Sequence, residues 1–114
     1  MTRIEKVATL NQEIQELEIN LDNFSLYYPL PEKMKELFKL VNVFSVDNPK
    51  FNAYIKQYCI DDLSEYIIET AAGVPERVDR KRYMEEKIDI FKWTCNSVSR
   101  FFKKGCDYYG ISIT

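Results

Sequence analysis

The side chains on which most enzymes rely are missing from this sequence. No histidine occurs among the 114 residues, so neither a Ser-His nor a Cys-His nucleophile pair can form. The Glu-x-x-His motif of metal-binding helix bundles is excluded for the same reason. No glycine-rich phosphate-binding loop is present either. We therefore expect a protein that has no catalytic residues, is not an enzyme and needs no metal or cofactor.

Two other sets of residues have the chemistry to form a site. Glu65 and Glu69 are one helical turn apart and could share a cation, although a solvated acidic helix face is the stronger interpretation. The cysteines are Cys59, Cys95 and Cys106, an odd number without a CxxC pair, which argues against a disulfide framework. Cys95 falls within an apolar stripe, which predicts packing. Cys106 follows two lysines and is the better candidate for a reactive thiol, although we expect packing there too.

Basic side chains gather in the C-terminal part of the chain. Residues 71–114 carry nine bases and six acids, whereas residues 1–70 carry seven bases and twelve acids. Positive charge at a helix start opposes the helix dipole, so a basic cluster there suggests phosphate binding, with a solvated helix end as the alternative. The candidate nucleic-acid contacts are Arg77, Arg80, Lys81, Arg82, Arg100, Lys103 and Lys104.

Four long segments with helical spacing must position these residues. They cover approximately residues 3–28, 31–44, 50–72 and 76–104. Thr2 and Glu5 form a capping box at the start of the first segment. Asn48, which precedes a proline, marks the start of the third segment. Gly73 and Gly105 are expected to end the last two helices. The sequence therefore predicts one all-α domain over residues 1–114, an antiparallel up-and-down bundle of four helices.

The expected last helix is apolar over more than half of its circumference. Its core stripe, at 100° per residue, consists of Met84, Ile88, Phe91, Cys95, Val98 and Phe102. A second set lies outside that arc and consists of Tyr83, Ile90, Trp93 and Phe101. These side chains either contact a second neighbour within the bundle or form an interface with another subunit or a partner protein.

The start of the sequence, MTRIEKVATLNQE, lacks the apolar region of a signal peptide. No apolar run approaches the ~20 residues that cross a bilayer. We expect a cytoplasmic protein without a membrane partner.

From about residue 37 to residue 113 the sequence resembles one family. The segments that carry the resemblance are LFKLVNVF, DDLSEYIIETA, RKRYMEEKIDIFKWTCNSVSRFF and a terminal GIS. They are similar to the four-helix-bundle proteins related to the accessory variability determinant of diversity-generating retroelements, a group that includes bundle proteins of ribosomal-RNA intervening sequences. The resemblance implies a ring-like homo-oligomer, typically a pentamer, that binds a reverse transcriptase or nucleic acid. The retroelement proteins are strongly basic, whereas this chain has a pI of about 5.2.

Two functions of different classes follow from these observations. The first is a non-enzymatic accessory or adaptor protein that self-associates and binds a macromolecular partner, either a protein such as a reverse transcriptase or a nucleic acid. The alternative is a small inhibitor or immunity protein of phage or plasmid type, which would bind one protein target through its acidic helices. A metal-dependent bundle enzyme is a third class, which the missing histidine disfavours.

Overall fold

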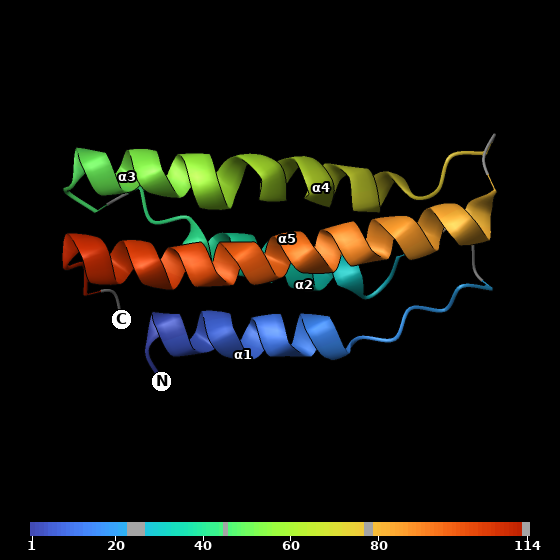
Figure 1. Ribbon diagram of the computed structural model, residues 1–114, viewed down its shortest axis with the longest axis horizontal. Helices are drawn as coiled ribbons and strands as arrows, with labels where there is room; N and C mark the ends of the chain where they lie inside the picture. The colour runs from blue at the N-terminus through green and yellow to red at the C-terminus, as the bar shows by residue number, and fades with distance from the viewer. Residues whose placement is uncertain (23–26, 45, 77–78, 113–114) are drawn as a thin grey trace.

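In the computed structural model, which describes residues 1–22, 27–44, 46–76 and 79–112, the chain forms four helical rods and no strand among those residues. The rods are α1 (Arg3–Glu16), α2 (Leu30–Val41), a continuous rod of α3 (Pro49–Ile55), η1 (Lys56–Ile60) and α4 (Asp61–Ala72), and α5 (Arg80–Tyr109). Each rod runs antiparallel to the one before it, and they enclose one core (Figure 1). The predicted all-α, up-and-down bundle of four helices is confirmed.

The first helix begins as predicted but ends a dozen residues early. The hydroxyl of Thr2 accepts a hydrogen bond from the amide of Glu5, which completes the capping box. The helix ends at Glu16 instead of about residue 28. The ammonium of Lys92 on α5 donates hydrogen bonds to the carbonyl oxygens of Gln15 at 3.2 Å and Leu17 at 2.6 Å. A cation at a helix C-terminus satisfies the free carbonyl groups there. The early end of α1 therefore coincides with a contact from Lys92 of α5, far along the chain.

The chain beyond α1 still contributes to the core without being helical. Leu17 and Leu21, which lie in the range predicted as helical, are partly buried against the core. Phe24, in the same predicted range, lies outside the described residues. Tyr27 is buried and Tyr28 is exposed.

The third rod starts and ends where the sequence predicts. The side chain of Asn48 accepts a hydrogen bond from the amide of Phe51 at 3.0 Å, and Pro49 occupies the first helical position. Gly73 ends the rod with a positive φ of 83°. The π-helical turn η1 was not predicted; in it the amide of Asp61 donates to the carbonyl of Lys56, five residues earlier.

The last helix is shifted toward the C-terminus relative to the prediction. Asp79 caps its start, and its carboxylate accepts a hydrogen bond from the amide of Arg82 at 3.3 Å. Gly105 does not stop the helix, which continues to Tyr109 and ends at Gly110 with a left-handed φ of 65°. Gly105 lies inside the helix, where the ring of Tyr54 packs against it and leaves no room for a Cβ atom.

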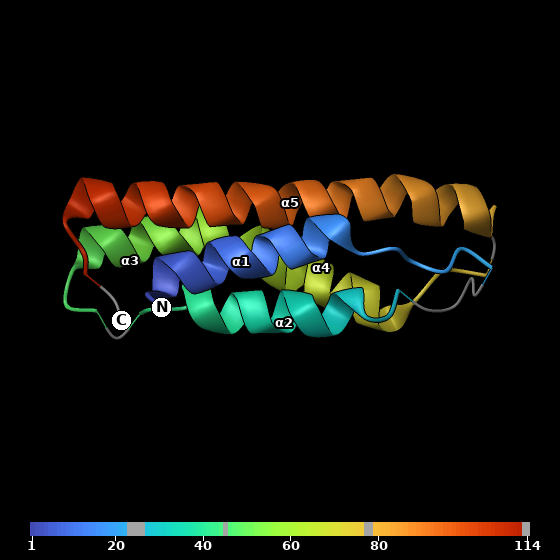
Figure 2. The same cartoon turned by 90° about the horizontal axis from the view of Figure 1, so that it is seen from below.

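The predicted core stripe of α5 faces the interior. Met84, Phe91, Cys95, Val98 and Phe102 are buried and Ile88 is partly buried. Figure 2 shows α1 in front, between α5 and α2, with α4 behind. The bundle measures 46 × 25 × 17 Å, so α5 spans most of its length. Within the described ranges, no helix is both long and apolar enough to cross a membrane.

Candidate nucleic-acid interface

Aromatic side chains gather at the end of the bundle where α3 and η1 lie beside the last turns of α5 (Figure 1). We call this surface the tyrosine-rich end. Its aromatic members are Tyr54, Tyr58, Phe101, Tyr108 and Tyr109. The Tyr58 ring stacks on Phe101 with centroids 5.1 Å apart and planes at 28°. The Tyr109 ring lies 5.9 Å from Tyr54. The rings therefore form one connected cluster rather than isolated side chains.

Tyr54 is the fixed centre of this cluster. Its hydroxyl donates a hydrogen bond to the carbonyl of Phe101 at 3.0 Å. Its ring lies on Gly105, where an added Cβ atom would come within 2.5 Å of the ring. Burial is the main cause that raises the pKa of Tyr54, so the phenol stays protonated and remains a donor at neutral pH. The glycine thus allows the third rod to approach α5 closely at this end.

The π-helical turn contributes Tyr58 to the surface. Tyr58 lies within η1, and its ring centroid is 4.8 Å from that of Tyr54. In the same turn, Cys59 points inward and is buried, with its sulfur 3.8 Å from the carbonyl of Val98. Turns of this kind often occur at functional sites, because they change the direction of the side chains they carry.

The tyrosine-rich end also concentrates positive charge. Residues 49–60 and 99–109 carry five basic side chains, Lys50, Lys56, Arg100, Lys103 and Lys104, and one acid, Asp107. The rest of the chain carries eleven bases and seventeen acids. All five basic residues are exposed, and none forms an ion pair with another described residue. This end is therefore locally attractive to anions although the whole chain is acidic.

Two adjoining hollows mark this surface. One is lined by Tyr54, Tyr58, Phe101, Lys104, Tyr108 and Tyr109 and has a volume of about 450 Å³. The other is lined by Arg100, Phe101, Lys103, Lys104 and Asp107. The two share Phe101 and Lys104, so an aromatic hollow lies directly beside a basic one.

The candidate nucleic-acid contacts divide into two groups. Arg100, Lys103 and Lys104 lie at the tyrosine-rich end. Arg80, Lys81 and Arg82 are exposed at the opposite end of α5, roughly 30 Å away along a helix that rises 1.5 Å per residue. There the guanidinium of Arg82 pairs with Glu86 at 3.1 Å. Arg77 lies outside the described residues.

The candidate partner-interface residues also fall into two groups, one packed within the bundle and one exposed. The hydroxyl of Tyr83 donates to Glu69 on α4 at 3.3 Å, and Phe101 stacks with Tyr58. Both are partly buried within the bundle. Ile90 and Trp93 instead lie on the outer face of α5, with exposed fractions of 40% and 66%. Tyr83 and Phe101 therefore contact a second neighbour within the bundle, which is the third rod. Ile90 and Trp93 remain uncovered.

Glu69 and Cys106, two of the residues with the chemistry to form a site, have contacts or burial within the bundle. The carboxylate of Glu69 pairs with the ammonium of Lys87 at 2.6 Å, and this hydrogen bond is the main cause that raises the pKa of Lys87. No group of three His, Cys, Asp or Glu residues within the described ranges could hold a metal ion together. Cys106 is buried, and burial raises its pKa to about 11, which favours packing over reactivity.

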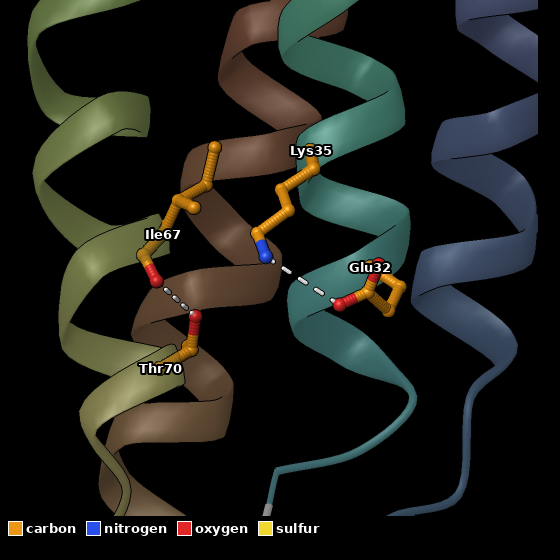
Figure 3. A network of polar contacts seen from close by, with 4 residues as sticks. All are labelled: Glu32, Lys35, Ile67 and Thr70. Carbon is orange, nitrogen blue, oxygen red and sulfur yellow. Dashed lines mark hydrogen bonds and ion pairs between the residues drawn. The ribbon is translucent and has the colours of Figure 1, made fainter.

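A further hollow lies between α2 and α4. Its apolar lining comes from Phe38, Ile67 and Ile68. Figure 3 shows the polar groups beside it, which pair within their own helices: Lys35 with Glu32 at 3.5 Å, and the hydroxyl of Thr70 with the carbonyl of Ile67 at 2.9 Å. Glu36, Lys39 and Ser64 also line the hollow, so its lining combines apolar and polar side chains.

No protein-family model, curated protein or solved structure matches the chain. Sequence reasoning found the three α5 bases of the tyrosine-rich end but missed Lys50, Lys56 and the pairing of Tyr54 with Tyr58. The available signal was the i, i+4 spacing of the two tyrosines in a segment without acids.

Proposed function

We propose that the protein is a non-enzymatic accessory protein that binds nucleic acid through the tyrosine-rich end. The observation that carries this proposal is the combination of five unpaired basic side chains with an aromatic cluster on an otherwise acidic molecule. Basic side chains bind the phosphate backbone by releasing counterions, and exposed aromatic rings stack on bases. The remainder of the chain is acidic on balance, which favours binding of a polyanion at this end.

The α5 bases have a suitable arrangement for phosphate contacts. Arg100 and Lys104 are four residues apart, and Lys103 lies three residues after Arg100, so the three share one side of the helix. Cations without protein partners bind phosphate without first breaking an ion pair. Arg80 and Lys81 at the opposite end of α5 also form no ion pair with a described residue, whereas Arg82 is paired with Glu86. The aromatic cluster beside the bases therefore distinguishes the tyrosine-rich end.

Fluorescence anisotropy with a labelled oligonucleotide tests the proposal. The double variant Lys103→Gln/Lys104→Gln should weaken binding and make it less dependent on salt, because each phosphate contact contributes to the salt slope. The matched control is Arg80→Gln/Lys81→Gln, which removes the same charge from the opposite end of α5. An equal loss in both variants would mean that binding does not occur at the tyrosine-rich end. Absence of binding at low salt would refute nucleic-acid binding altogether.

We also propose that the protein self-associates through the outer face of α5. Trp93 and Ile90 are three residues apart on this face and leave a large apolar surface uncovered. Tryptophan is a favoured anchor of protein interfaces, and its removal can cost about 2 kcal/mol or more of binding free energy. The ring-like homo-oligomer implied by the resemblance would bury such a face.

Sedimentation of Trp93→Ala beside the unchanged protein tests this assembly. If Trp93 anchors an interface, the variant should shift toward monomer while its melting temperature changes little. Ile68→Ala is the matched control, since Ile68 is exposed on α4, away from this face. A protein that is already monomeric would instead support the alternative function, an inhibitor that binds one protein target through its acidic helices.

A further inference from the structure

Tyr108 is the most exposed large apolar side chain at the tyrosine-rich end. Its exposed fraction is 83%, whereas its aromatic neighbours Phe101 and Tyr109 on the same helix are partly buried. Its ring lies 4.9 Å from that of Tyr109, with planes at 85°. Tyr109 in turn contacts Phe51 and Tyr54. The exposed ring therefore stands beside a packed aromatic layer.

Tyr58 is the second ring available to a ligand. It is 43% exposed although it stacks on Phe101, so part of the phenol remains open to the aromatic hollow. The core residues of this part of the rod are Ile55 and Cys59, which are buried, whereas Tyr58 remains partly open to solvent. Tyr58 and Tyr108 thus line one hollow from two different helices.

The neighbouring basic hollow determines what kind of ligand fits. A flat apolar group between Tyr58 and Tyr108 would have Lys104 at its edge and Arg100 and Lys103 in the adjoining hollow. An unpaired nucleotide has this combination, a base with an open face joined to a phosphate. The bases of a duplex are stacked on each other, so their faces cannot reach a side chain.

We propose that the tyrosine-rich end binds single-stranded nucleic acid, with an unpaired base stacked on Tyr108 and Tyr58 and its phosphates on Arg100, Lys103 and Lys104. This inference rests on the proposed nucleic-acid binding and adds the strandedness of the ligand. Stacking accepts every base, so recognition has little sequence preference.

Fluorescence anisotropy again provides the test, with a labelled single strand and a labelled duplex of equal length. The single strand is an oligodeoxythymidylate of roughly 15 nucleotides, a length within the range that small single-strand binding sites cover. The single strand should bind more tightly than the duplex at the same salt concentration. Tyr108→Ala should weaken single-strand binding by roughly 5- to 100-fold. Tyr108→Trp should retain it, because the larger ring also stacks. The duplex affinity should not change in either variant.

Two controls separate failure of this inference from failure of the proposed function. Tyr28→Ala removes another exposed tyrosine, one outside this cluster, and should leave single-strand binding unchanged. If Tyr108→Ala and Tyr58→Ala both bind the single strand normally while Lys103→Gln/Lys104→Gln does not, the site binds phosphate alone and base stacking is refuted. Duplex binding as tight as single-strand binding would also refute it. Loss of all binding in the unchanged protein would refute both proposals.

Discussion

Gly105 shows how a single missing side chain shapes the candidate interface. The glycine lies inside α5, where it destabilises a helix relative to alanine by roughly 0.5–1 kcal/mol. Tyr54 occupies the space that a Cβ atom would fill and anchors its hydroxyl on the carbonyl of Phe101. The close contact between the third rod and α5 therefore depends on this residue.

We predict that Gly105→Ala lowers the free energy of unfolding by about 1–3 kcal/mol, because the added methyl group overpacks the Tyr54 ring. Thermal unfolding followed by circular dichroism measures the change. In a Tyr54→Leu background the same substitution should cost less, because the obstructing ring is gone. A Gly105→Ala protein that is more stable than the parent would show that helix propensity outweighs the contact.

At the level of the helices, polar contacts decide where α1 lies and where it ends. The side-chain amide of Asn11 on α1 donates to the side-chain oxygen of Asn96 on α5 at 3.1 Å, and the side-chain amide of Gln15 donates to the carbonyl of Lys92 at 2.7 Å. The ammonium of Lys92 donates hydrogen bonds to the carbonyl oxygens of Gln15 and Leu17 at the end of α1. A helix of 14 residues is marginal by itself, so these contacts and its buried face hold it in place.

Replacing Lys92 by methionine should lower stability by about 1–2 kcal/mol, because two carbonyl oxygens lose a charged donor while the apolar stem is retained. Urea unfolding gives this difference. Lys103→Met is the matched control on an exposed position of the same helix and should change stability by less than about 0.5 kcal/mol. Equal stability of the two variants would mean that the Lys92 contacts do not stabilise the end of α1.

For the molecule as a whole, three buried thiols and one buried phenol make the free energy of unfolding depend on pH in the alkaline range. Burial raises the pKa of Cys59 and Cys95 from 9.0 to about 12 and that of Cys106 to about 11. Burial is also the main cause that raises the pKa of Tyr27 from 10.0 to about 12. An unfolded chain loses these protons at lower pH than the folded protein does.

Stability should therefore be constant below about pH 9 with respect to these groups and fall as the pH rises toward 11–12. The melting temperature, measured at several pH values, reports this fall. Cys95→Ala removes one titrating group, so it should lose less stability over this interval than the parent, even if the smaller side chain lowers stability at every pH. Identical pH dependence of both proteins would contradict the linkage.

The sequence alone was enough for the class of fold. Apolar spacing and local signals such as Thr2, Asn48 and Gly73 predicted four antiparallel helices and the buried stripe of α5, because periodicity and capping are properties of neighbouring residues. The same reasoning identified the basic residues of α5 but not which of them lie beside the aromatic cluster.

Tertiary structure decided the remainder. α1 ends at Glu16, where Lys92, 76 residues further along the chain, contacts its final carbonyls. α5 continues through Gly105 because Tyr54 of another rod packs on that glycine. Tyr58 and Tyr108 line one hollow only because the third rod and α5 meet at the same end of the bundle. Each of these features depends on residues far apart in the chain, and local propensity carries no information about which distant groups will meet.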